Sequence, residues 1–256
     1  MTADPSHPHE AEWKQNPDRT DLTPASPVAE APPEGVLTED SALSFLQKTD
    51  LPRETLERLA RNGELLKHRR VKVALVCHAH TPRHLALPLL RQLYTFDLVQ
   101  VSLTPVVTGD LKRAAEDLLC GRLESISAGE RVSLARRASG RVAAALLQDK
   151  DARIMHAALQ NPRLTEAHVI QALMRHGVPV STVEAICHHR EWSLRREVRA
   201  ALLRNERTPM ARAMEFARSF APPQLREILQ TSRLPETVKG YLLRDLAQRS
   251  RSAARY

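Results

Sequence analysis

The feature of this sequence that most constrains its fold is a pattern that recurs about every 42 residues. Helix-start signals, a hydroxyl residue followed by Pro or by an acid, are separated by 46, 38 and 43 residues; they are Thr81-Pro82, Ser127 with Glu130, Thr165-Glu166 and Thr208-Pro209. A small or leucine residue followed by leucine recurs at intervals of 43, 41, 43 and 40 residues, at Leu75, Leu118, Leu159, Leu202 and Leu242. Because two independent landmarks share one interval, the sequence predicts a repeat array.

The units of this array are predicted to be helical. Apolar residues follow helical spacing from Thr38 to about Ser250, and with four Phe, three Tyr and two Trp the apolar content consists mainly of Ala, Leu and Val. Within a unit we expect three short helices, at 165–175, 179–189 and 192–205 in one and at 127–137, 139–148 and 150–160 in another. Such a unit cannot bury its own apolar face, so neighbours must stack. The prediction is an all-α solenoid over residues 37–250, with about five units of roughly 42 residues and two to three helices each.

Two segments carry a resemblance to a known class of repeat. Asp151-Ala-Arg-Ile-Met-His-Ala-Ala-Leu159 and Arg196-Glu-Val-Arg-Ala-Ala-Leu-Leu203 resemble the second half of a HEAT repeat. The endings Asn161-Pro162 and Asn205, each followed by a threonine start, are similar to the leucine-rich-repeat-variant arrays of bacteria. The resemblance implies a HEAT/armadillo-like fold over roughly 66–250, with the unit at 95–122 departing from the pattern.

The charge divides the chain into unlike parts. Residues 1–36 hold seven acids, two bases and seven prolines, which predicts a disordered, acidic, Pro-rich tail. The rest carries a formal charge of +13 and ends in a basic stretch, 251–256, that we expect to fray. Of the 38 basic residues 31 are Arg, which suits bidentate contacts with carboxylates or phosphates, although such usage also follows genome composition. One hypothesis is that the tail folds back onto the basic body.

A column of basic residues recurs in register with the leucines, six or three positions before them. We call this set the basic column and predict that it contacts a partner; it comprises Arg69, Lys72, Lys112, Arg153, Arg196, Arg199 and Lys239, with His156 in the same register. In a stacked array these positions form a line that can follow an acidic peptide or a phosphate backbone. The alternative is an internal ladder, in which Arg153 and Arg196 pair with Asp149, Asp151 or Glu197.

Metal and catalytic sites are not expected. Cys77, His78, His80 and His84 form one group and Cys187, His188 and His189 another, but adjacent helical residues point about 100° apart and no C-x-x-C or H-x-x-x-H pair exists. The three cysteines are predicted to be free thiols, and Ser139-Gly140-Arg141 is interpreted as a linker in preference to a phosphate-binding turn. A HEAT-like DNA glycosylase remains a remote enzyme alternative, with Trp192 and Asp149 or Asp151 as its only candidate residues.

The sequence therefore predicts a non-catalytic protein-interaction scaffold without a cofactor, whose partner is a protein, possibly an acidic one. The alternative is nucleic-acid binding through the phosphate backbone, whose affinity falls steeply with salt. No apolar stretch approaches the roughly 20 residues that cross a bilayer, so we expect no membrane association and a cytoplasmic location.

Overall fold

The structure, a computed structural model, describes residues 38–253. Over this range every regular element is helical, as predicted, and no strand is present. The tail predicted at residues 1–36 lies outside the described residues. The last helix ends at Ala253, so part of the stretch expected to fray is helical and residues 254–256 lie outside the described range.

The helices are short, most of them eight to ten residues long. In chain order they are α1 (Glu39–Leu46), α2 (Arg53–Arg61), η1 (Leu65–Lys67), α3 (Arg69–Cys77), α4 (Arg83–Arg91), α5 (Thr95–Leu103), α6 (Gly109–Arg122), α7 (Ala128–Arg137), α8 (Gly140–Leu146), α9 (Ala152–Leu159), α10 (Glu166–Met174), α11 (Val180–His188), η2 (Trp192–Leu194), α12 (Arg196–Arg204), α13 (Met210–Ala217), α14 (Pro222–Gln230) and α15 (Glu236–Ala253).

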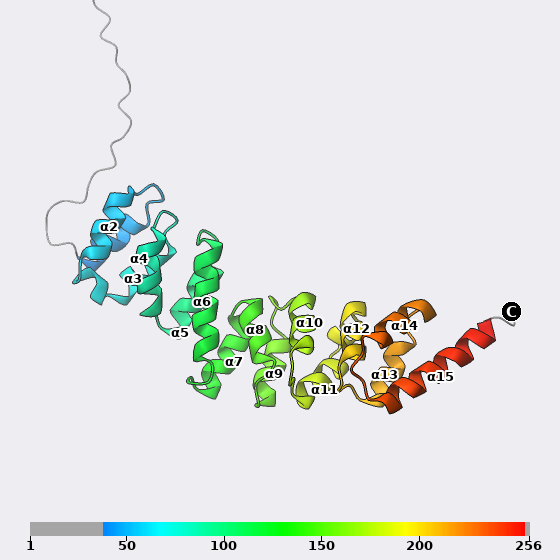
Figure 1. Cartoon of the computed structure of the whole chain (residues 1–256). Helices are drawn as coiled ribbons and strands as arrows, with labels where there is room; N and C mark the ends of the chain where they lie inside the picture. The colour runs from blue at the N-terminus through cyan, green and yellow to red at the C-terminus, as the bar shows by residue number, and fades with distance from the viewer. Residues whose placement is uncertain (1–37, 254–256) are drawn as a thin grey trace, which may run out of the picture.

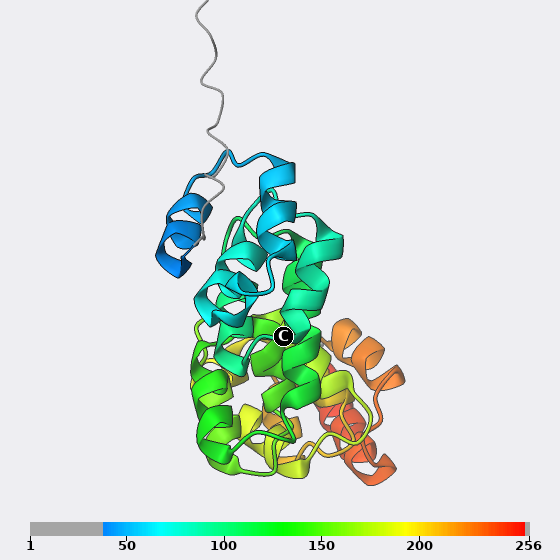
Figure 2. The same cartoon turned by 90° about the vertical axis from the view of Figure 1, so that its left-hand side faces the viewer.

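The helices follow one another along an elongated body (Figure 1), with α1 to α4 at one end and α15 at the other. Figure 2 shows the same body turned by 90°, with α1 to α4 toward the viewer. The main packing partners of each helix are one or two places away in the chain, as in the pairs α5–α6, α7–α9, α10–α12 and α1–α3. The apolar core therefore extends along the body instead of gathering at one centre.

Two kinds of helix start are present. Ser127 and Glu130 form the predicted capping box of α7, and the Thr165 hydroxyl accepts from the His168 N–H at the start of α10. At the other two starts the predicted threonine cap is wrong by one position, because Pro82 and Pro209 are the capping residues.

Thr81 and Thr208, which precede those prolines, act differently. Each is buried, and its hydroxyl turns back to donate to a carbonyl six residues earlier, at 2.6 Å from Leu75 O and Leu202 O respectively. Each threonine thus gives a hydrogen bond to a carbonyl in the last turn of the preceding helix, where the helix itself supplies no N–H from its next turn.

The predicted leucine landmark is buried in four of its five places. Leu75, Leu159, Leu202 and Leu242 are buried, whereas Leu118 is only half-buried and the next residue, Leu119, is fully buried. The landmark is therefore wrong by one residue in the segment predicted to be irregular.

Gly140, at the start of α8, allows two segments to approach closely. A Cβ placed there would lie 2.2 Å from Arg163 O and 2.5 Å from the His168 ring. The Ser139-Gly140 pair is thus a packing point between α8 and the start of α10, which supports the linker interpretation.

The three cysteines are free: Cys77 and Cys120 are half-buried, and Cys187 is buried. Burial raises the pKa of the Cys187 thiol to about 12. No helix in the described part of the chain is long and apolar enough to cross a membrane.

Candidate partner-binding surface

The basic column begins at Arg69, which makes the most complete ion pair of the set. Its guanidinium binds both carboxylate oxygens of Asp97 at 2.7–3.0 Å and lies over the Tyr94 ring at 5.2 Å. Asp97 is buried and also accepts from the Tyr94 backbone N–H at the start of α5. The contact raises the pKa of Arg69. Arg69 therefore links α3 to α5, with 57% of its side chain still exposed.

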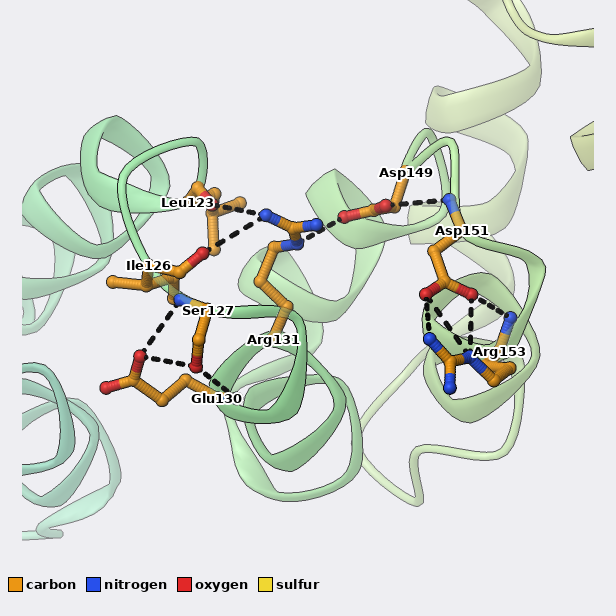
Figure 3. A network of polar contacts seen from close by, with 8 residues as sticks. All are labelled: Leu123, Ile126, Ser127, Glu130, Arg131, Asp149, Asp151 and Arg153. Atoms are coloured by element: carbon orange, nitrogen blue, oxygen red, sulfur yellow. Dashed lines mark hydrogen bonds and ion pairs between the residues drawn. The ribbon is translucent and has the colours of Figure 1, made fainter.

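Arg153 pairs with an acid of its own turn. Its guanidinium and its backbone N–H both bind the Asp151 carboxylate, at 2.7–3.3 Å and 2.9 Å (Figure 3). These bonds lower the pKa of Asp151. The acid pairing predicted for Arg153 is confirmed, and 80% of this side chain remains exposed.

The same figure shows how the neighbouring acid is used. Asp149 pairs with Arg131 at 2.9 Å and accepts from the Asp151 N–H, while Arg131 also donates to Leu123 O and Ile126 O (Figure 3). Asp149 thus forms its ion pair with Arg131, which does not belong to the basic column. This network ties the loop before α7 to the turn between α8 and α9.

Arg196 and Arg199 contact no acid among the described residues. Arg196 donates to the Gln224 side chain and lies over Phe220 at 5.6 Å, so its predicted acid pairing is wrong. Arg199 donates to Ser193 O at 2.7 Å and lies over Phe216 at 5.5 Å. Both are held by packing and neutral acceptors.

The three lysines of the column also have partners within the chain. Their Nζ atoms donate to acceptors at 3.0–3.2 Å: Lys72 to Gln92, Lys112 to Pro105 O and Lys239 to Glu236. Every member of the basic column thus makes a polar contact within the chain. Arg69, Lys72 and Arg196 link neighbouring helices, whereas Arg153 and Lys239 bind an acid of their own turn. The N–H groups that these bonds do not use remain available at the surface.

A second recurring set of polar contacts joins helix ends, and we call these the closing bonds. Asn161, after α9, is buried and its amide donates to Ala135 O at 2.7 Å and Ala138 O at 3.1 Å, at the end of α7. Asn205, after α12, donates to Leu173 O at 2.8 Å, and His78, after α3, to Lys48 O at 2.9 Å. All three side chains also accept a backbone N–H two residues later. Three helix ends along the chain therefore make the same two kinds of bond.

Arginines make further closing bonds next to these. Arg122 donates to Arg91 O and Leu93 O at 2.9 and 2.7 Å, Arg163 to Arg137 O at 3.2 Å, and Arg207 to Val178 O at 2.6 Å. The Arg122 and Arg163 guanidinium groups are thereby placed beside the ends of α4 and α7, and that of Arg207 beside the loop between α10 and α11.

At those same helix ends lies a set of exposed arginines that we call the arginine row. It comprises Arg91, Arg137, Arg175 and Arg218, the last residue or the C-cap of α4, α7, α10 and α13. Within the described part of the chain, their guanidinium groups make no hydrogen bond or ion pair. Each lies ten residues after one of the four predicted helix starts, so the signal was present in the sequence. A cation at a helix C-terminus also stabilises the helix, which is the purely structural role of this position.

Two hollows adjoin the row. One, of about 390 Å³, lies between α5 and α7 and is lined by the apolar Phe96, Val99 and Leu103 and by Arg136, Arg137 and Arg163. We call it the α5–α7 groove. A smaller one, of about 10 Å³, is lined by Arg175, Arg204, Arg207 and Arg233 and by one acidic residue, Glu206.

The residues considered for other chemistry have structural contacts. Trp192 is buried, and its indole N–H donates to Leu159 O at 3.0 Å. The His78 and His80 rings lie 5.9 Å apart, but no three His, Cys, Asp or Glu residues of the described chain are grouped as metal ligands.

The chain was also compared with known proteins. No family model, curated protein or solved structure matches it.

Proposed function

We propose that this chain is a non-catalytic scaffold that binds an acidic protein partner along the arginine row. The helices are interpreted as a HEAT/armadillo-like solenoid of five units, namely α1–α3, α4–α6, α7–α9, α10–α12 and α13–α15. Packing between near neighbours and the recurrence of the closing bonds at His78, Asn161 and Asn205 support this division. Equivalent positions of stacked units form a line.

The observation that carries the proposal is the arginine row itself. Four of the proposed units place an exposed guanidinium, without a hydrogen bond or ion pair among residues 38–253, at the end of their first helix, and in three of them a closing-bond arginine lies beside it. Guanidinium groups bind carboxylates in a bidentate manner, and four of them at regular intervals match a series of acidic side chains. The basic column, whose members all have contacts within the chain, is proposed to contribute secondary contacts through the exposed sides of Arg69 and Arg153.

The test compares two charge-reversed variants of the full chain by binding of a fluorescent poly-glutamate peptide at low ionic strength. In one, the arginine row is changed to Glu: Arg91, Arg137, Arg175 and Arg218. In the control, four exposed arginines that also lack a described partner are changed: Arg58, Arg70, Arg190 and Arg226. Both variants carry the same net charge, so a loss of affinity confined to the first supports the row. Equal loss in both would show that only total charge matters and would refute the proposal.

The second candidate function is nucleic-acid binding, and the lining of the smaller hollow favours it. Its four arginines outnumber the one acidic residue beside them, and guanidinium groups attract the phosphates of a nucleic-acid backbone. Duplex DNA binding should then fall with salt with a logarithmic slope of about −0.9 for each phosphate contacted. Absence of DNA binding at low salt, together with poly-glutamate binding, would leave the protein partner as the better proposal.

A further inference from the structure

The α5–α7 groove combines two properties that point to one kind of ligand. Its apolar lining includes Phe96, whose side chain is 43% exposed, a high value for a large apolar residue. Its charged lining consists of arginines only, and the guanidinium groups of Arg136 and Arg137 make no hydrogen bond or ion pair within the described residues. A site with these properties fits a bulky apolar side chain flanked by carboxylates.

We propose that the occupant of this groove is the chain's own N-terminal segment around Trp13. The sequence there reads Glu10-Ala11-Glu12-Trp13, which places a large aromatic residue one and three positions after an acid. Asp18 and Asp21 follow, and residues 1–36 together carry seven acids against two bases. The indole would contact Phe96 and Leu103, and the carboxylates of Glu10 and Glu12 would pair with Arg136 and Arg137.

The segment is long enough to reach the groove. Trp13 lies 25 positions before Thr38, a contour of at most about 90 Å at 3.3–3.6 Å per residue. The helices α1 and α3 are in direct contact, as are α3 and α5. At roughly 8–10 Å per helix packing, α5 lies about 20 Å from α1. A tether of this length keeps the effective concentration of the segment near the millimolar range.

This inference goes beyond the proposed function, because it needs no second molecule. Arg137 belongs both to the groove and to the arginine row, so a docked N-terminal segment would cover part of the surface proposed for the partner. An acidic partner would then have to displace a segment of the same charge. The segment would compete with the partner for the same arginines, so that only a partner of sufficient affinity would displace it.

Trp13 provides its own reporter, measured as acrylamide quenching of fluorescence in the full chain. The other tryptophan, Trp192, is 4% exposed and gives a weakly quenched background, which a Trp13→Phe variant supplies for subtraction. At low salt we expect the quenching constant of Trp13 to be severalfold lower than in a free peptide of residues 1–36. It should rise to the peptide value in 1 M salt, where charges are screened within about 3 Å.

The groove is tested by an Arg136→Glu/Arg137→Glu variant against an Arg190→Glu/Arg226→Glu control with the same net charge. Full exposure of Trp13 in the groove variant and protection in the control supports the proposal. Equal quenching in wild type, groove variant and free peptide would overturn it. Protection that depends on protein concentration would also overturn it, since the segment would then bind a second copy. Helical circular dichroism of each variant verifies that the fold is retained.

A direct measurement complements the quenching. Photo-crosslinking from a benzoylphenylalanine placed at position 13 should give adducts within 96–103 or 133–137, the segments that line the groove. Adducts confined to other helices would contradict the assignment even if Trp13 were protected.

Discussion

Replacing Asn161 by alanine removes three hydrogen bonds from a buried position. The amide donates to Ala135 O and Ala138 O, the carbonyl accepts from Arg163 N at 2.7 Å, and the side chain is 3% exposed. A typical hydrogen bond contributes about 1 kcal/mol net, and a buried partner left unsatisfied costs about 1–3 kcal/mol. We therefore expect the free energy of unfolding to fall by about 3 kcal/mol, a large part of a stability of about 5–15 kcal/mol.

The assay is urea unfolding at 25 °C followed by circular dichroism, with Gln160→Ala as the matched control. Gln160 is the exposed neighbour at the end of α9, and its replacement should change stability by no more than about 0.5 kcal/mol. Asn161→Asp keeps the acceptor for Arg163 N but turns a carboxylate toward two carbonyls, so it should be at least as harmful as alanine. A loss below about 1 kcal/mol for Asn161→Ala would refute the view that closing bonds hold a unit together.

Three further predictions concern single side chains. Gly140→Ala should destabilise the chain by about 3 kcal/mol because its Cβ has no room, whereas Gly129→Ala, which meets nothing within 4 Å, should be neutral in the same thermal unfolding assay. The folded-state pKa of Asp151 is lowered by its bonds from Arg153, so this carboxylate stabilises the fold above its unfolded-state pKa and stops doing so as pH falls through its folded-state pKa. The difference in unfolding free energy between wild type and Asp151→Asn should therefore shrink toward low pH, as measured by urea titrations between pH 7 and 2.5. Cys187, with its pKa near 12, should resist thiol reagents at pH 8 until the chain unfolds, and modification in the native state, detected by peptide mapping, would contradict its burial.

Helix positions were predictable because helical periodicity and start signals are local. The expected helices at 165–175 and 179–189 match α10 and α11 within one residue at each end. The expected helix at 192–205 is divided into η2 and α12, with Trp192 buried in the shorter piece. The hydrogen bond from Trp192 Nε1 to Leu159 O, 33 residues away, is a tertiary contact that no local sequence pattern predicts.

The role of each cation was harder to predict than its register. Arg69 and Lys112 occupy equivalent places in the sequence, yet one meets a buried carboxylate 28 residues away and the other a backbone carbonyl seven residues away. The position of a residue in the repeating pattern determines the face of the helix on which it lies. Its bonding partner depends on the side chains of the neighbouring helix, and these differ along the chain. The arginine row keeps the spacing of the helix starts and not that of the leucines, so a register taken from the leucines does not contain it.

The closing bonds have a direction that bears on how the protein is made. In each of them the donor side chain comes later in the chain than the carbonyl that accepts: His78 after Lys48, Asn161 after Ala135, Asn205 after Leu173. During synthesis the accepting carbonyl therefore leaves the ribosome before the side chain that binds it. In the proposed division into units, a unit with such a bond can close as soon as its third helix has emerged, so that folding can follow synthesis from the amino end.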